Sequence, residues 1–523
     1  MPATGLIDYF KPERGVVGSA IGGWLDFVPS GRGVWFFLFW FVILWTAFQI
    51  ISFASLGLNP DLLETYAWAL HPSAGYYKHP PLGALIATAW FTVFPPADWS
   101  FDLMAMINAA VALYATDLIA RRYLSGDKRA VVLLMLVLTP FYQFHAQRFG
   151  ANQTLLSTWP IATYCFLRAF ETRGLVWSVA AGATAALAML GKYYSVFLLA
   201  GFLVAALAHP ARWTYLRSAS PWLSAAVGAV VLTPHIQWLF ATGFTTFSYA
   251  TALHTSVSFA EVLAADARYL AGGIAYVGVP LAVYWLAVRP DWRLFRETVW
   301  PPDPDGRMLI TLLTVPLALP AIAAPLIGAV LTPLWTMPAW FLLPIVLLRP
   351  QAASFSRIAS IRTTVLVVAV TLASLAAAPW LAWHYHETGS KEGREYYRPV
   401  SAKITDAWHL FTATRLRIVQ GEPGLASAVT FYSPDHPDSV PNFQLRAAPW
   451  VTPDRLNQEG FATICMTDDK ACLETAQREA AGKANTQVVT FSTTSRYRGD
   501  AGKLGRFTFI LVPPQGTRPP PVR

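Results

Sequence analysis

The chain has 523 residues, of which 54% are hydrophobic and only 13% are Asp, Glu, Lys or Arg. A soluble protein is about 25% charged, so this composition excludes a soluble globular protein, a disordered chain and a disulfide scaffold. The class that fits is a polytopic α-helical membrane protein. The net charge of +9 alone suggests nucleic acid, but the positions of the basic residues argue for membrane topology.

A membrane-spanning helix needs about 20 predominantly apolar residues, and the sequence contains eleven stretches of this kind. A segment at residues 1–33 precedes the first stretch, and the transmembrane domain is expected over residues 34–385 with a first outer loop at 55–100. The predicted spans are 34–54, 101–120, 130–147, 152–170, 174–191, 193–208, 221–241, 267–288, 308–329, 331–348 and 363–383.

Lys and Arg residues predict the orientation of these spans, because they accumulate on the cytoplasmic side of a membrane. With a cytoplasmic N-terminus, eighteen of them fall in inner segments and four in outer segments before the C-terminal region. This asymmetry predicts a multi-pass protein of the cell inner membrane whose C-terminal region lies in the periplasm. The basic residues are thereby explained by topology, with no nucleic acid as a partner.

The first outer loop contains a helix start at Asn59-Pro60-Asp61, with Asn as the N-cap, Pro at the first helical position and an acid in the first turn. Helices are predicted over Asp61–Leu70 and Leu82–Phe94, both lying at the membrane interface. Trp68 and neighbouring aromatic residues suit that depth.

The composition becomes polar near residue 390, and residues 386–523 are predicted to form a periplasmic α/β domain. Cys465 and Cys472 can pair if this domain faces an oxidising compartment, a question that the sequence leaves open. The Pro-rich end, Pro513–Arg523, is expected to be frayed. Strands are expected at Ala428–Tyr432, Ala462–Met466 and Arg506–Val512, and helices near Ser401–Arg415 and Ala471–Ala481.

Ionisable residues at membrane depth are costly, and we therefore treat them as candidates for function. Asp61 is either an acid that stabilises its helix dipole or a general base that takes a proton from an attacking hydroxyl. Glu64 follows three residues later, on the same face of the same helix. Asp61 is our candidate catalytic residue, and Glu64 is a candidate substrate contact.

The segment Tyr76-Tyr77-Lys78-His79 precedes two prolines. It is either a turn in front of an interfacial helix or part of a phosphate site, because a Lys beside an imidazole suits an anion at the bilayer surface. For Tyr76 and Tyr77, anchoring at the interface competes with stacking on a sugar or lipid.

Two further outer turns carry polar candidates. Arg148 can contact a phosphate, and Asn152 either binds a sugar hydroxyl or caps the fourth span. Lys192, followed by Tyr193, is either a solvated residue of a short hairpin or a second phosphate contact. The sequence contains no zinc pattern.

The arrangement of Asp61, Trp68 and the run from Gly75 to Leu82 (Gly-Tyr-Tyr-Lys-His-Pro-Pro-Leu), together with the Lys192-Tyr193 pair, resembles a known family. It is similar to the polyprenyl-phosphate-sugar-dependent glycosyltransferases of the GT-C superfamily, which include protein mannosyltransferases, aminoarabinose transferases and rhizobial galacturonosyltransferases. Many members carry an Asp where this chain has Asn152, and Asn cannot ionise. That difference leaves Asp61 as the main candidate acid.

The resemblance implies a GT-C fold and an inverting hexosyl- or pentosyltransferase. It would move a sugar from a polyprenyl phosphate, such as undecaprenyl phosphate, to an acceptor hydroxyl at the outer face of the inner membrane. The acceptor expected is lipopolysaccharide, another envelope glycolipid or a protein. A divalent cation stays open as a cofactor. The competing readings are a flippase for lipid-linked sugars and a ligase for whole glycans.

Overall fold

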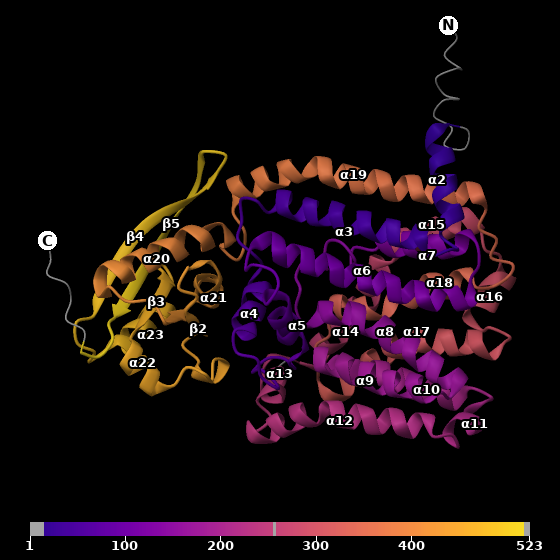
Figure 1. The fold of residues 1–523 in the computed structure, drawn as a ribbon, viewed down its shortest axis with the longest axis horizontal. Coiled ribbons are helices and arrows are strands. Elements are labelled where there is room, and N and C mark those ends of the chain that lie inside the picture. Colours follow the sequence, from indigo (N-terminus) through magenta and orange to yellow (C-terminus); the bar gives the residue numbers. More distant parts are fainter. Residues whose placement is uncertain (1–14, 255–257, 517–523) are drawn as a thin grey trace, which may run out of the picture. The chain divides into compact units, whose positions relative to one another are not determined.

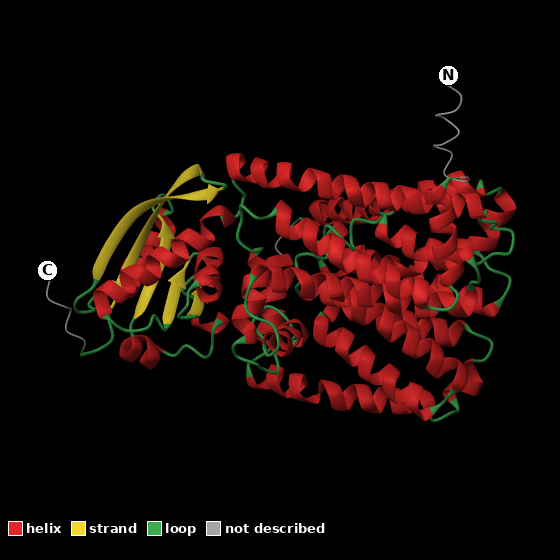
Figure 2. Ribbon diagram, turned by 45° about the horizontal axis from the view of Figure 1, so that its top comes forward, coloured by secondary structure: helices red, strands yellow, loops and turns green. Residues whose placement is uncertain are grey.

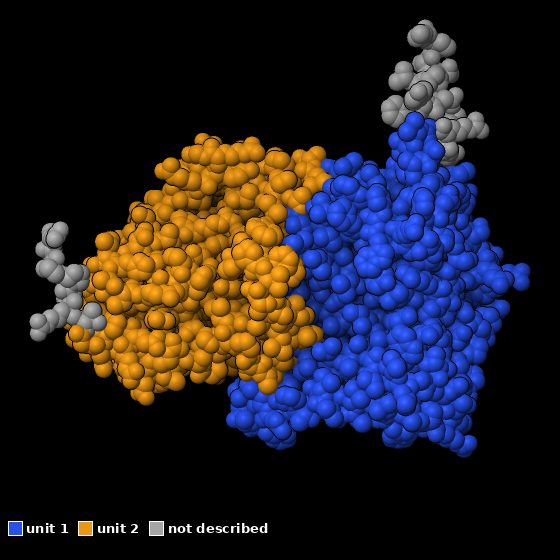
Figure 3. Space-filling model, in the orientation of Figure 1, with its two compact units in different colours: residues 1–46, 103–373 blue, residues 47–102, 374–523 orange. Residues whose placement is uncertain are grey.

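The computed structural model describes residues 15–254 and 258–516. Within these ranges the chain is mostly helical, and its strands fall between residues 418 and 512 (Figure 1, Figure 2). The chain divides into two compact units, each assembled from separate stretches of sequence (Figure 3). Unit 1 contains residues 1–46 and 103–373, and unit 2 contains residues 47–102 and 374–523.

Unit 1 is built from helices that pack on one another, with α8 against α9, α9 against α12, and α10 against α17. Glycines permit the close contacts, since a Cβ on Gly182 of α9 would lie 2.2 Å from the backbone oxygen of Ser224 on α12. The helices that lie in unit 1 wholly or in part are α2 (Val16–Phe27), α3 (Arg32–Ser52), α6 (Asp98–Tyr123), α7 (Asp127–Val137), α8 (Ala151–Thr172), α9 (Leu175–Gly191), η1 (Tyr193–Ser195), α10 (Val196–Ala208), α11 (Arg212–Leu216), α12 (Ser220–Ala241), α13 (Thr245–His254), α14 (Phe259–Tyr276), α15 (Gly278–Val288), α16 (Trp292–Val299), α17 (Pro304–Ile327), η2 (Pro333–Leu342), α18 (Leu343–Leu348) and α19 (Arg357–Thr388). Of these, α3, α6 and α19 each extend into unit 2 at one end.

Five of the described helices are long and apolar enough to cross a membrane, namely α3, α6, α12, α17 and α19. The number rises to six if α14 and α15, which meet at a bend of 50°, form one span. The helical class is confirmed, but the predicted total of eleven spans is not, because several of the expected spans form helices too short or too polar to meet this criterion.

Two predicted spans differ from the structure for reasons visible in the chain. The helix expected over 130–147 ends at Val137, three residues before Pro140, which lacks a backbone N–H and restricts the residue in front of it. The segment 331–348 forms the 3₁₀ helix η2 followed by the short helix α18, because three prolines interrupt it. A single continuous α-helix is therefore the wrong prediction for both segments.

In unit 2, the predicted first outer loop (residues 55–100) forms α4 (Pro60–Ala69) and α5 (Leu82–Phe91), which confirms both predicted helices. Asn59 is the N-cap of α4, and its side-chain Oδ1 accepts a hydrogen bond of 3.0 Å from the backbone N–H of Asp61. The start of α4 is therefore fixed by the residues that the sequence indicated.

The C-terminal part of unit 2 is a mixed sheet with helices, in agreement with the predicted α/β class. The strand order is β2-β1-β3-β5-β4, with β1 parallel to β2 and β3, and β5 antiparallel to β3 and β4. The elements are η3 (Arg394–Tyr396), α20 (Tyr397–Thr412), β1 (Ile418–Gly421), α21 (Pro423–Tyr432), β2 (Asp438–Pro441), η4 (Leu445–Ala447), α22 (Pro453–Glu459), β3 (Phe461–Met466), α23 (Lys470–Ala480), β4 (Gln487–Tyr497) and β5 (Asp500–Val512).

The strand predicted at Ala428–Tyr432 is wrong, because these residues form the second half of α21. Glu422 caps this helix by accepting hydrogen bonds from two backbone N–H groups, and Pro423 occupies the first turn. The helix is buried on nearly all sides, so its apolar run does not show helical periodicity. The other two predicted strands fall within β3 and β5. Of the predicted frayed end, residues 517–523 lie outside the described residues.

Cys465 of β3 and Cys472 of α23 are joined in a disulfide, with their Cα atoms 5.8 Å apart. The third cysteine, Cys165, is buried in unit 1. The sequence left the pairing open, and the structure resolves it.

The grouping of residues 47–102 with the C-terminal residues differs from the predicted division at residues 34–385 and 386–523. Packing explains the grouping, because α21 lies against α4 in unit 2. The Tyr66 ring of α4 makes an edge contact with the Phe431 ring at 4.8 Å between centroids. The backbone N–H of Leu58 donates a hydrogen bond of 2.8 Å to the hydroxyl of Tyr432.

Candidate functional site

The predicted site residues fall into two groups, one in each unit. Unit 2 contains Asp61, Glu64, Tyr76, Tyr77, Lys78 and His79, whereas unit 1 contains Arg148, Asn152, Lys192 and Tyr193. The structure describes the geometry within each group, and the assembly of both groups around one substrate remains a prediction.

Asp61 lies in the first turn of α4, and its side chain is exposed. The Asn59 cap holds its backbone N–H, and its carbonyl oxygen accepts a hydrogen bond of 2.7 Å from the Thr65 hydroxyl. A carboxylate at this end of a helix is stabilised by the helix dipole. Asp61 is thus an accessible carboxylate on a fixed backbone, as a general base requires.

Glu64 and Lys78 form an ion pair, with 2.6 Å between Oε1 and Nζ. The side chains are 19% and 29% exposed, respectively. Burial raises the pKa of Glu64 above its ordinary value and the nearby Asp61 adds to this rise, although the Lys78 ammonium acts in the opposite direction. The structure therefore places an acid and a cation of the predicted set in direct contact, one helical turn from Asp61.

The two tyrosines of the predicted site have different surroundings. Tyr76 is only 3% exposed, and its ring stacks on Trp68 at 5.0 Å. The Tyr76 hydroxyl donates to the carbonyl oxygens of Trp68 and His71. Tyr77 is partly exposed and lies beneath the guanidinium of Arg446, which is 5.0 Å from the ring centroid. Tyr76 has a packing role here, and substrate contacts of both tyrosines stay predictions.

His79 is partly exposed and makes an edge contact with Trp68 at 6.1 Å between ring centroids. Its carbonyl oxygen accepts a hydrogen bond of 3.1 Å from the backbone N–H of Tyr76. This bond closes the turn that presents Lys78 to Glu64. The turn alternative is therefore correct for the backbone, while a phosphate contact by these side chains remains a prediction.

In unit 1, the ammonium of Lys192 donates a hydrogen bond of 2.7 Å to Asn152 Oδ1 and lies 4.3 Å from the ring centroid of Trp335. Burial lowers the pKa of Lys192 to about 7. Lys192 is therefore not the solvated residue of a plain hairpin. A cation held by an amide and an aromatic face has the neutral and apolar surroundings in which an anionic ligand binds strongly.

Asn152 does not cap α8, because the N-cap is Gly150 and no side chain caps that end. Its amide is instead committed to Lys192, which is a correction to the capping alternative. Arg148 is exposed, and none of the described carboxylates forms an ion pair with it. The sequence paired Asn152 and Lys192 only as members of one site, and their direct contact follows from the packing of α8 against α9.

Tyr193 is placed by a second set of contacts in unit 1. Its hydroxyl lies 2.7 Å from Nε2 of His235 on α12, and its ring stacks on Phe247 at 4.7 Å. His235 is therefore a direct neighbour of a predicted site residue.

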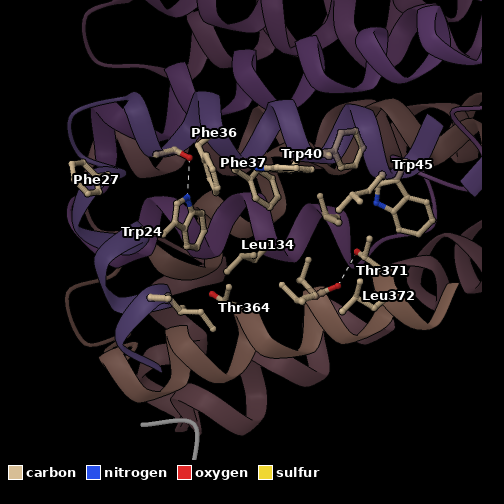
Figure 4. A pocket seen from close by; sticks show the side chains of 18 of the residues that line it. Trp24, Phe27, Phe36, Phe37, Trp40, Trp45, Leu134, Thr364, Thr371 and Leu372 are labelled. Carbon is tan, nitrogen blue, oxygen red and sulfur yellow. Dashed lines mark hydrogen bonds between the residues drawn. The ribbon is translucent and has the colours of Figure 1, made fainter. Parts of the chain in front are cut away.

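An apolar groove of about 770 Å³ lies between α2, α3, α7 and α19 in unit 1. Figure 4 shows Trp24, Phe36, Phe37 and Trp40 around it, with the Trp24 indole N–H donating to the Gly33 carbonyl oxygen at 2.8 Å. None of the predicted site residues lines this groove. Its lining suits hydrocarbon and lacks the groups that acid–base chemistry needs.

A metal centre built from several protein ligands is not evident in the described residues, where no group of three or more His, Cys, Asp or Glu side chains is arranged to hold an ion.

Comparison with known proteins supplies a family signal for part of the chain. Residues 78–238 match the model of the dolichyl-phosphate-mannose-protein mannosyltransferase family. This range contains Lys78, Arg148, Asn152 and Lys192. No curated protein matches the chain in a sequence search.

Two solved structures share the fold. The chain is similar to ArnT from Cupriavidus metallidurans bound to undecaprenyl phosphate, with a TM-score of 0.56, 14% identity, and 92% of this chain and 99% of that chain covered. The apo state of the same protein gives a TM-score of 0.53 and 14% identity, with 90% and 97% covered. The expected likeness to GT-C transferases is confirmed: the chain has the ArnT fold, and its residues 78–238 match the mannosyltransferase family model.

Proposed function

We propose that this protein is a membrane glycosyltransferase that moves a sugar from a polyprenyl phosphate to an acceptor hydroxyl. The observation that carries the proposal is the family match over residues 78–238, because that range contains six of the candidate substrate-binding residues, namely Lys78, His79, Arg148, Asn152, Lys192 and Tyr193. The shared fold with ArnT, which binds undecaprenyl phosphate, supports undecaprenyl phosphate as the lipid of the donor.

The proposed reaction is a displacement at the anomeric carbon. The acceptor oxygen forms the new bond to that carbon, and the bond from the carbon to the phosphate oxygen breaks. The electron pair leaves with the phosphate, and the hydroxyl proton passes to the Asp61 carboxylate. Attack opposite the leaving phosphate inverts the anomeric configuration.

Cations lower the barrier by stabilising the negative charge that develops on the leaving phosphate. Because burial lowers the pKa of Lys192 to about 7, an anion that binds beside its amine favours the protonated, positively charged form. Arg148, Lys78 and His79 are the further candidates for this role. The phosphate is already a weak base, so the reaction needs no general acid.

The location proposed is the inner membrane with the C-terminal region in the periplasm, and the acceptor is lipopolysaccharide or another envelope glycolipid. The disulfide between Cys465 and Cys472 agrees with an oxidising compartment for that region.

The test is a transfer assay with the purified chain reconstituted in vesicles, with donor and acceptor supplied on the same side of the membrane. Undecaprenyl phosphates carrying mannose, glucose, galacturonate or aminoarabinose serve as donors. A covalent product that depends on the donor supports a transferase. Movement of the donor across the bilayer without a product identifies a flippase and refutes the proposal. Transfer only from a diphosphate-linked glycan identifies a ligase.

A further inference from the structure

A small polar cavity lies in unit 2, directly beside the ion pair of Glu64 and Lys78. The loop and the C-terminal region both line it, the latter through Ser427 of α21, Ser439 of β2 and Trp450. The space inside is about 10 Å³, which is room for about one water-sized group. The predicted catalytic acid, Asp61, lies one helical turn away from this cavity.

One residue that lines the cavity, Trp450, carries a side-chain donor without a partner among the described residues. The indole N–H of Trp450 is buried and has no hydrogen-bond partner among the described residues. An unpaired buried donor costs about 1–3 kcal/mol, so an oxygen atom of a ligand or of water next to this N–H is strongly favoured.

Trp450 is held in place on two sides. Its ring stacks on His71 at 4.5 Å between centroids, and His71 in turn contacts the carboxylate of Asp438. Arg455 donates to Asp438 Oδ2 at 2.9 Å and to the carbonyl oxygen of Trp450 at 2.9 Å. The ring therefore keeps its position without a ligand, as a preorganised recognition group does.

The chemistry of the lining matches one hydroxyl group. A hydroxyl donates one hydrogen bond and accepts others. The Trp450 N–H and the Lys78 ammonium supply donors, the Glu64 carboxylate supplies an acceptor, and the hydroxyls of Ser427 and Ser439 can do either. A phosphate or a whole sugar ring is too large for the space, but a single hydroxyl of a sugar fits.

We infer that this cavity is a subsite for one hydroxyl group of the transferred sugar, and that Trp450 and Ser439 of the C-terminal region determine which sugars are accepted. The inference rests on the proposed function. It gives the C-terminal region a defined part in the reaction, because its residues complete the pocket next to the catalytic helix α4.

The experiment compares the wild-type full chain with Trp450→Phe and Ser439→Ala, using the undecaprenyl-phosphate sugar that the wild type uses and its single-deoxy analogues. Trp450→Phe keeps an aromatic ring but removes the pyrrole half of the indole together with its N–H, a loss of ring that the matched control below shares. We expect it to lower kcat/KM about 5- to 10-fold, mainly through KM, on the parent donor. On one deoxy analogue, which lacks the hydroxyl, wild type and variant should be equal.

Trp408→Phe is the matched control, because the indole N–H of Trp408 is also buried and without a described partner in unit 2 but does not line the cavity. This variant should leave both kinetic constants unchanged. Thermal unfolding of each variant shows whether it is folded, and Ser439→Ala provides a second route if Trp450→Phe is not.

The outcomes separate the two proposals. If the wild type transfers sugar and the cavity variants equal it on every donor, the cavity holds only a water molecule and the subsite is refuted while the transferase stands. The subsite is also refuted if Trp450→Phe lowers kcat/KM by the same factor on every deoxy analogue as on the parent donor. If the wild type neither transfers nor binds any donor, in equilibrium binding with radiolabelled lipid, both proposals fall together.

Discussion

Replacing Lys78 by Met should lower the free energy of unfolding, because the Lys78 ammonium, 2.6 Å from Glu64 Oε1, compensates the charge of that partly buried carboxylate. Removing one partner of a fully buried pair costs about 3–5 kcal/mol. Since the two side chains are 29% and 19% exposed, we expect about 2 kcal/mol at neutral pH, after allowing for solvent screening.

The loss should depend on pH in a defined direction. The folded-state pKa of Glu64 lies above its ordinary value even with Lys78 present, and removing the ammonium raises it further. An acid whose pKa is raised by folding destabilises the folded state as pH increases above its unfolded-state pKa, and the loss is complete once pH passes its folded-state pKa. Lys78→Met should therefore resemble wild type at low pH. Relative to wild type it should lose up to about 1.4 kcal/mol per pH unit above the folded-state pKa that Glu64 has in the wild type, until the higher folded-state pKa in the variant is passed.

The assay is thermal unfolding of the purified chain in detergent between pH 4 and pH 8. A loss of about 2 kcal/mol corresponds to roughly 4–8 °C in a domain of 150–250 residues. The double variant Glu64→Gln/Lys78→Met removes the charge as well as its partner and should recover most of the loss. A deficit that is independent of pH, or that persists in the double variant, would refute the electrostatic explanation.

Further outcomes can be measured on the same preparation. Asp61→Asn should reduce transfer at least 100-fold with unfolding unchanged, and near-normal turnover would remove Asp61 as the base. Lys192→Ala should raise donor KM about 10-fold or more, and wild-type KM should rise above about pH 7, where the Lys192 ammonium loses its proton; a flat profile would contradict an ammonium–phosphate contact. Replacing Cys465 and Cys472 by Ser should cost roughly 2 kcal/mol, and a thiol titration that finds both cysteines free in the oxidised wild-type protein would contradict the disulfide.

The sequence predicted well those features that depend on local chemistry. The cap at Asn59, the two loop helices and the mixed C-terminal domain all follow from capping residues, apolar periodicity and composition. The predictions went wrong where a short apolar run had no period, as at Ala428–Tyr432, and where prolines divided an apolar stretch, as in the segment 331–348.

The sequence supplies candidate site residues but not the contacts between them. Nothing in the spacing of Asn152 and Lys192 indicates that one amide accepts from one ammonium, because the contact depends on how α8 and α9 pack. No sequence pattern indicated Trp450 as a site residue, because its position beside His71 and the Glu64–Lys78 pair arises from tertiary structure, across more than 370 residues of sequence separation.

The compact unit formed by residues 47–102 and 374–523 has a practical consequence for protein engineering. Cutting the chain after α19 would strip α4 of its contacts with α21, leaving Tyr66 and its apolar neighbours facing water. Such a truncation would disturb the helix that carries Asp61, the proposed base, so lost activity would say nothing about acceptor recognition. Chimeras with proteins of the same fold should exchange residues 47–102 and 374–523 together as one module.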